Sequence, residues 1–377
     1  MVGDKGEASG AGTRSIDGDA DEMLTIQRYA VLEAEATVEM ALPILTAFTP
    51  VTYQRNGVPV WLRSERELIR YVDHNFEAEI PGLFAPGALF APACYVNSFT
   101  PDEKSLVDAI RDKVAGMTLR MFGRSIRPMT NLLVQVAPLR ILSELARVRG
   151  LASLSVYEAG PGLGYLGALL AMTGHRYASY DVSPAMYLWQ NRLMAETAGD
   201  AFREGALCPD APVDDPTFIQ SRVLHLPWWR HYGMFGTFPR PIDVIYSNSN
   251  ICEMHRVSAR LLMRRARPLL EASPLGLFVF MSWGFPGQGS ADDLHAEFLN
   301  EGYRRVQGGL PFKAYVPAER DTSDIEQAFA AGIPLYNPAG SDVRLTADDL
   351  MAIRRAEAPV DVAPAMEFYG WRPPFLD

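Results

Sequence analysis

The sequence predicts an α/β fold in which a mainly parallel sheet follows a mainly α-helical N-terminal region. Short apolar stretches alternate with helical patterns across residues 151–320, and a glycine-rich turn joins the first stretch to the helix after it. Such alternation is typical of βαβ units, whose strands lie parallel and whose helices cover the sheet. Residues 22–150 show helical periodicity without this alternation of strands and helices.

Composition restricts the classes of function. The 377 residues are 48% hydrophobic and 21% charged, which is typical of a globular enzyme and excludes wholesale disorder. The formal net charge of -10 disfavours a nucleic-acid partner, because phosphate binding needs a concentrated positive surface. No stretch approaches the ~18 apolar residues of a membrane span. We expect a cytoplasmic protein with a small-molecule substrate; the oligomeric state stays open.

Four regions are expected along the chain. Residues 1–21 lack the apolar segment of a secretory signal and are expected to form a disordered tail. Residues 22–150 should be mainly helical and form much of the pocket for the substrate. Residues 151–320 should bind a cofactor, and residues 321–377 should pack on the body as an extension. Within the first region we expect helices from residue 23 and at 64–76, 102–122 and 131–148, a hairpin-like segment at 51–62 and an apolar loop at 80–101.

Residues 156–167, Val-Tyr-Glu-Ala-Gly-Pro-Gly-Leu-Gly-Tyr-Leu-Gly, are the most informative stretch. An apolar strand leads into Glu158, glycines follow at positions 160, 162 and 164, and a helical pattern covers residues 165–172. Glycine lets a ligand approach the main chain closely, and the N–H groups at a helix start attract anionic or polar groups. The turn therefore predicts a site for a small cofactor.

Two readings of this turn compete. Residues 162–167 match the dinucleotide fingerprint G-x-G-x-x-G, and Asp181 lies at a suitable distance to bind a ribose. In that reading Gly160 and Pro161 interrupt the preceding strand. The alternative reading ends the strand at Tyr157 and leaves the glycines in the turn.

Further strands follow in order. Residues 177–181 form a β-leaning run that ends in Asp181, before a helical pattern at 185–198. Residues 241–247 predict a strand whose exit is at Asn248. It is followed by a loop to His255, a helix to residue 270 and a strand over 275–283. A helix at 291–300, strands at 303–306 and 312–316, and a helix at 324–331 complete the pattern.

The glycine turn, Asp181 and the later elements resemble, in this order, the motifs of class I S-adenosylmethionine (SAM) methyltransferases. The resemblance implies a Rossmann-like sheet, parallel with a terminal antiparallel strand, and SAM as the cofactor. It implies that Gly160, Gly162 and Gly164 cradle SAM through backbone contacts and that the Asp181 carboxylate accepts hydrogen bonds from both ribose hydroxyls. Glu158 would anchor the turn or the methionine amino group of SAM.

The resemblance also implies the rest of the cofactor site. Val182 and Met186 are expected beside the adenine. His225 and Leu226, which follow a strand expected at 221–224, are expected there too, although His225 could equally be a loop histidine. Asn248 should lie near the methionine moiety or the methyl group.

Three segments are similar to bacterial sugar O-methyltransferases: residues 181–193, 224–229 and 246–250. This closer resemblance covers roughly residues 120–320 and implies transfer of a methyl group to a hydroxyl of a sugar or sugar-like metabolite, as in natural-product biosynthesis. Methylation at carbon or nitrogen, an NAD(P)-dependent oxidoreductase and a SAM-binding protein without activity remain alternatives.

Catalytic groups are sought after the fourth strand. His255 and Glu253 are the candidates, because histidine has a suitable ordinary pKa and a buried carboxylate can act as a base. A helix-start or packing role is the alternative for His255. Asp243 resembles the acid that begins the family's fourth motif. Trp228 and Trp229 could stack on a sugar or anchor a loop.

Other clusters receive structural interpretations. Asp292, Asp293 and His295 are expected to form a helix cap and a solvated turn, so no metal is expected. The three cysteines, too few and too scattered for a disulfide framework, are expected to be reduced thiols. A solvated helix face is expected from five arginines: Arg256, Arg260, Arg264, Arg265 and Arg267.

Overall fold

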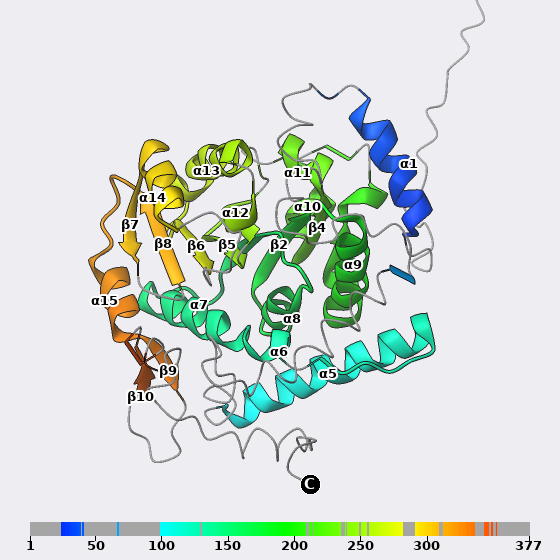
Figure 1. Ribbon diagram of the computed structural model, residues 1–377, viewed down its shortest axis with the longest axis horizontal. Coiled ribbons are helices and arrows are strands. Elements are labelled where there is room, and N and C mark those ends of the chain that lie inside the picture. The colour runs from blue at the N-terminus through cyan, green and yellow to red at the C-terminus, as the bar shows by residue number, and fades with distance from the viewer. Residues whose placement is uncertain are drawn as a thin grey trace, which may run out of the picture.

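The computed structural model confirms the α/β class: a central eight-stranded sheet lies between two layers of helices (Figure 1). The structure describes residues 24–38, 40, 66–67, 99–128, 130–208, 211–212, 214–234, 238, 240–248, 250–254, 256–281, 291–308, 312–335, 343–346, 348–349 and 352. The expected tail at 1–21 and the hairpin at 51–62 lie outside these residues. The expected helix at 64–76 and the loop at 80–101 lie almost wholly outside them.

The strand order is β3-β4-β2-β1-β5-β6-β8-β7. All neighbours from β3 to β6 pair in parallel, and β8 runs antiparallel to both β6 and β7, as the sequence predicted. A separate pair, β9 (Ile333–Leu335) and β10 (Val343–Leu345), is antiparallel. The strands of the main sheet are β1 (Ser155–Ala159), β2 (Arg176–Asp181), β3 (Phe202–Glu204), β4 (Val223–Pro227), β5 (Val244–Asn248), β6 (Leu277–Met281), β7 (Tyr303–Gln307) and β8 (Phe312–Pro317).

The inner strands are buried along their whole length, which is why they read as nearly continuous apolar runs. Helices α7, α8 and α9 pack on one face, and α13 and α14 on the other. Helix α5 crosses outside α8 and α9 (Figure 1). The longer helices are α1 (Ile26–Thr37), α5 (Pro101–Phe122), α7 (Val136–Val148), α8 (Tyr165–Met172), α9 (Pro184–Ala198), α13 (Arg256–Glu271), α14 (Ala291–Asn300) and α15 (Ser323–Ala331). The shorter ones are α6 (Thr130–Leu133), α10 (Pro216–Gln220), α11 (Trp228–Met234), α12 (Asn250–Glu253) and the 3-10 turns η2 (Gly199–Ala201) and η3 (Gly205–Leu207).

Local sequence explains where the main helices begin. Thr100 and Glu103 form a capping box before α5, with Pro101 as the first helical residue. Ser183 is the N-cap of α9: its hydroxyl accepts from the Met186 N–H, and Pro184 is the first helical residue. These signals leave two residues, 182 and 183, between the end of β2 and the start of α9.

The helix expected at 131–148 is wrong as a continuous element. It is divided into α6 and α7, and Val134 and Gln135 lie between them. Pro138 lies in the first turn of α7, where its missing N–H costs nothing, whereas its ring would clash with the carbonyl of residue 134 in an unbroken helix.

Three strand and loop boundaries also differ from the prediction. Strand β1 runs to Ala159 instead of ending at Tyr157. Strand β4 extends to Pro227, so His225 lies inside a strand instead of after it. Trp228 and Trp229 are not in a loop, because α11 begins at Trp228.

The two tryptophans join α11 to the N-terminal helix. The Tyr29 ring of α1 lies 4.9 Å from that of Trp229, and the Trp228 indole N–H donates to Glu33 at 2.6 Å. Tyr29 also contacts Tyr187 of α9, at a ring distance of 5.2 Å. Helix α1 is thereby held against the helices that follow β2 and β4.

The arginine face of α13 is exposed, as expected, and it also forms ion pairs: the Arg256, Arg260 and Arg264 side chains are 71%, 43% and 66% exposed. Arg260 bonds to Glu297 at 3.0 Å and Arg264 to Glu301 at 2.9 Å, and Arg256 also pairs with Glu297. The Glu297 and Glu301 side chains of α14 are only 2% and 7% exposed. Helical spacing showed that the arginines share a face, but it could not show that α14 presents two carboxylates to that face.

The expected cap and solvated turn at Asp292, Asp293 and His295 is wrong, because all three residues lie within α14. The His295 ring lies 3.2 Å from the Tyr315 hydroxyl, and no group of His, Cys, Asp and Glu suited to a metal occurs among the described residues. Cys208 and Cys252 are free thiols. No helix in the described part of the chain is long and apolar enough to cross a membrane.

Asp243 connects three strands at the edge of the sheet where they begin. Its carboxylate accepts hydrogen bonds from the Ser155 N–H at 2.8 Å and from the Ser273 hydroxyl at 2.7 Å. Its own N–H donates to the Ser155 carbonyl, and its carbonyl accepts from Leu277. The acid of the expected fourth motif therefore lies away from the edge where the strands end and holds β1, β5 and β6 in register.

We predict that Asp243→Ala lowers the free energy of unfolding by about 2 kcal/mol, because it leaves the N–H of Ser155 without its carboxylate partner. Urea unfolding at neutral pH measures the change. The same substitution at the exposed Asp200 should leave the midpoint unchanged. Equal midpoints for both variants would contradict this role for Asp243.

Candidate functional site

The glycine turn lies where β1 ends, at the edge formed by the carboxyl ends of the parallel strands. Gly160, Gly162 and Gly164 have φ angles of 64°, 59° and 74°, in the left-handed region that other residues resist. Gly164 is the N-cap of α8. Three left-handed residues thus turn the chain from strand to helix within five positions.

The surroundings of the turn differ from glycine to glycine. A Cβ atom at Gly160 would lie 2.2 Å from Cγ of Asn250, the first residue of α12, so a side chain at Gly160 is excluded. No described atom lies within 4 Å of the equivalent position at Gly162. The main chain is therefore closely packed where it leaves β1 and open at the middle of the turn.

Asp181 is the last residue of β2 and lies beside the turn. Strand β2 pairs with β1, and the Gly160 N–H donates to the carbonyl of Tyr180 at 3.1 Å. The Asp181 carboxylate is 6% exposed; one oxygen accepts from the Ser183 N–H at 2.9 Å and the other from the Gln190 amide at 2.8 Å. Two donors from the start of α9 therefore hold this carboxylate at the edge of the sheet.

Glu158 is buried within β1, 1% exposed, and accepts a hydrogen bond from the Tyr177 hydroxyl at 2.6 Å. Burial raises the pKa of Glu158 to about 8, against the opposing effect of the Tyr177 bond. A Cβ atom on Gly167 would lie 2.5 Å from the Tyr177 ring, so this glycine makes room for the tyrosine. In this structure Glu158 links β1 to β2 through Tyr177, and α8 packs on the Tyr177 ring at Gly167.

The expected adenine neighbours divide into two groups. Val182 and Met186 are buried directly after Asp181, and the Met186 N–H donates to the Ser183 hydroxyl. His225 and Leu226 are fully buried in β4 and belong to opposite faces of the sheet, as alternation along a strand requires.

His225 is held beneath α9. Its ring stacks on Tyr187 at 4.2 Å, and its Nδ1 lies 2.6 Å from Oδ1 of Asn191. Because the Asn191 amide nitrogen donates to Glu204, its oxygen accepts from His225, which assigns the proton to Nδ1. Burial lowers the pKa of His225 to about 3, so the imidazole is neutral. Its position is that of a packed strand residue.

Asn248 ends β5, two positions beyond Tyr246, which is the residue paired with Glu158. This register brings Asn248 to the same edge as the glycine turn and Asp181. Glu253 is the last residue of α12, and its side chain, like the whole of His255, lies outside the described residues. Their expected catalytic role therefore stays a prediction.

Sequence reasoning missed Gln190, Asn250 and Tyr177. Gln190 lies in a helix that is buried nearly all round, so no polar stripe singles it out. Asn250 stood within a quoted motif, but only the packing of α12 shows that it lies against Gly160. Tyr177 reads as an ordinary strand residue until its hydroxyl is seen against Glu158.

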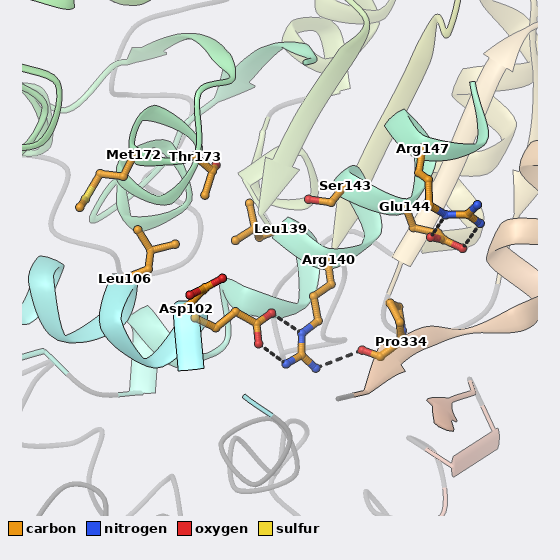
Figure 2. Close-up of a pocket in the computed structure, with 11 residues that line it drawn as sticks. Asp102, Leu106, Leu139, Arg140, Ser143, Glu144, Arg147, Met172, Thr173 and Pro334 are labelled. Carbon is orange, nitrogen blue, oxygen red and sulfur yellow. Dashed lines mark hydrogen bonds and ion pairs between the residues drawn. The ribbon is translucent and has the colours of Figure 1, made fainter. Parts of the chain in front are cut away.

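A groove of about 530 Å³ lies between α5, α7, the end of α8 and β9 (Figure 2). Arg140 crosses it with two bonds to Glu103, at 2.6 and 2.7 Å, and one to the carbonyl of Pro334 at 3.0 Å. The groove meets α8 at Met172 and Thr173, the opposite end of that helix from Gly164. It is therefore separate from the glycine turn.

Comparison with known proteins gives similarity to solved structures alone. No protein-family model matches the chain, and no curated protein matches it. Magnesium protoporphyrin IX methyltransferase (ChlM) from Synechocystis PCC 6803 with bound SAM is 13% identical, with a TM-score of 0.34 over 56% of this chain and 96% of that one.

Two other methyltransferase structures are similar to the same degree. The glycopeptide N-methyltransferase MtfA with S-adenosylhomocysteine is 14% identical over 46% of this chain and 86% of its own, with a TM-score of 0.30. CcbJ from Streptomyces caelestis is 15% identical over 48% and 90%, with a TM-score of 0.32. The fold assignment accordingly rests on the strand order and pairing of this chain itself.

The raised pKa values of Glu158 and Glu204 predict that the free energy of unfolding falls as the pH rises. Burial raises the pKa of each to about 8 from an ordinary value of 4.5, so between these limits the folded state keeps protons that the unfolded state has lost. Their contribution is complete below about pH 4.5 and is lost as the pH rises through 8, by at most about 1.4 kcal/mol per pH unit for each carboxyl.

Urea midpoints between pH 5 and 8 measure this slope. Glu158→Gln and Glu204→Gln should each make it shallower, because an amide has no proton to retain. Glu319→Gln, at an exposed position, should leave it unchanged. A slope identical in all four proteins would show that neither buried carboxyl is protonated in the folded state.

Proposed function

We propose that the protein is a SAM-dependent methyltransferase that transfers a methyl group to a hydroxyl of a sugar or sugar-like metabolite. One observation carries the proposal: the left-handed glycine turn and the Asp181 carboxylate lie side by side where β1 and β2 end. The turn offers open backbone, and Asp181 offers a fixed pair of acceptors. The antiparallel finish of the sheet agrees with the class I methyltransferases that the sequence resembles.

The residues present fit SAM. Both oxygens of the Asp181 carboxylate are hydrogen-bond acceptors, and a carboxylate oxygen can accept more than one hydrogen bond, so the two oxygens suit the two ribose hydroxyls. The open position at Gly162 allows a ligand to reach the main chain. Val182 and Met186 would contact the adenine, and Asn248 would lie toward the methionine moiety.

The structure gives less support for direct contact of His225, Leu226 and Glu158 with SAM. His225 would reach the adenine only if α9 shifted from its stacked position, because Tyr187 and Asn191 cover the ring. Glu158 acts on the site by linking β1 to β2 through Tyr177. We therefore assign direct cofactor contact first to the turn, Asp181, Val182 and Met186.

Methyl transfer from SAM is an in-line displacement that depends mainly on alignment of the reactants. SAM, when bound, supplies an electrophilic methyl group. The chain must position the acceptor hydroxyl and remove its proton, and alignment alone can supply several kcal/mol of the barrier. We propose His255 or Glu253 as the proton acceptor, because both follow β5 just beyond Asn248.

Calorimetry tests the cofactor. S-adenosylhomocysteine should bind more tightly than NAD, and Asp181→Ala should weaken its binding at least about tenfold, since hydrogen bonds to a charged acceptor are lost. Asp200→Ala is the matched control and should bind as the wild type does. Tighter binding of NAD would support the oxidoreductase alternative and overturn the methyltransferase proposal.

Turnover tests the catalytic candidates and the acceptor. Labelled SAM incubated with sugars, nucleotide sugars and cell extract should give a product whose new methyl group is on oxygen, by mass spectrometry. His255→Ala or Glu253→Gln should lower kcat about a hundredfold while the affinity for S-adenosylhomocysteine stays unchanged. A methyl group on carbon or nitrogen would refute the O-methyl assignment, and full activity of both variants would refute the proposed base.

A further inference from the structure

We propose that Gln190 is a positioning residue of the cofactor site, which holds the Asp181 carboxylate in the orientation that receives the ribose. The inference rests on the proposed function, because it deepens the assignment of Asp181. Gln190 lies on α9, nine positions after Asp181, and is 0% exposed.

One amide group of Gln190 joins both parts of the site. Its Nε2 donates to Oδ2 of Asp181 at 2.8 Å and to the carbonyl oxygen of Gly162 at 2.6 Å. Side chains of a helix point back toward its N-terminus, so this residue of the second turn reaches the end of β2. The acid and the middle of the glycine turn are thereby fixed to each other through a single group.

The orientation of the amide follows from its partners. Both groups that face Nε2, the Asp181 carboxylate and the Gly162 carbonyl, are acceptors. If the amide oxygen and nitrogen were exchanged, the amide oxygen would face these two acceptors with no hydrogen atom between them. The remaining Gln190 oxygen, Oε1, is buried and has no partner among the described residues. A buried acceptor left unpaired costs free energy, which is typical of a site completed by a ligand or water.

Gln190 is not the sole residue that holds the glycine turn in place. The neighbouring Trp189 donates its indole N–H to the carbonyl of Leu163 at 3.1 Å. The Asp181 carboxylate, by contrast, loses the amide donor to its Oδ2 if Gln190 is removed, while the Ser183 N–H still binds Oδ1. Loss of Gln190 should therefore affect the ribose contact more than the fold.

The test compares S-adenosylhomocysteine with its 2′-deoxyribose analogue, which lacks one hydroxyl for Asp181. In the wild type the analogue should bind more weakly. In Gln190→Leu the affinity for S-adenosylhomocysteine should fall about tenfold and that for the analogue much less, so the ratio of the two Kd values should approach one. In an Asp181→Ala background, Gln190→Leu should have no further effect on that ratio.

A second variant keeps the size and polarity of the side chain. Gln190→Glu places a carboxylate against Asp181 and the Gly162 carbonyl, so at neutral pH it should bind S-adenosylhomocysteine as poorly as Gln190→Leu. Protonation of the introduced carboxyl restores a donor, and its affinity should therefore recover as the pH falls. The wild type should not show this recovery, which loss of packing alone would not produce.

Controls separate the possible failures. Thr197→Val, which removes a hydroxyl bond to the Leu193 carbonyl near the far end of α9, should leave the Kd ratio unchanged. If the wild type fails to bind S-adenosylhomocysteine, the proposed function and this inference both fail. If binding depends on Asp181 but both Gln190 variants keep the wild-type ratio, the inference about Gln190 alone is overturned.

Discussion

The candidate site depends on one backbone constraint: the chain must pass from β1 to α8 within a turn that other elements crowd from two sides. Asn250 of α12 occupies the space where a side chain at Gly160 would lie, and α9 bonds to the carbonyls of Gly162 and Leu163. Left-handed φ angles let the chain turn there without strain. Parallel pairing brings the ends of β1, β2 and β5 to one edge, and the compact turn keeps its main chain there beside the Asp181 carboxylate.

A row of buried polar side chains crosses the sheet beneath α8 and α9, the two helices that flank the site. The strand pairing aligns Glu158, Ser179, His225 and Glu204 across β1, β2, β4 and β3. Burial favours the neutral forms of the two carboxyls and of the histidine, since few charges lie near enough to compensate. Helix α9 is thus placed over the sheet by the hydrogen bond between Asn191 and His225 as well as by apolar contact.

Helices α1, α5, α13 and α14 pack against the elements that hold the site and the sheet. Helix α1 packs through Tyr29 on α9 and α11, and α5 covers the outside of α8 and α9. The arginines of α13 are bonded to two buried carboxylates of α14, so this face of the sheet is closed by ion pairs above an aromatic core.

The sequence by itself determined the fold class, the main strands and their order along the chain with the exception of β3, the glycine turn, and the strand-end positions of Asp181 and Asn248. These features are local: apolar runs, helix caps and glycines express themselves within a few residues of chain. It misplaced the ends of β1 and β4 by a few residues and missed the break before α7, because packing decides how far a strand or helix continues.

Only the tertiary structure decided which side chains meet. Tyr177 against Glu158, Asn250 against Gly160, Gln190 between Asp181 and Gly162, and the α14 carboxylates against the arginines of α13 all join separate elements. No pattern within one segment records which residue of another segment approaches it. That choice follows from the sheet register and from the way each helix packs on the sheet.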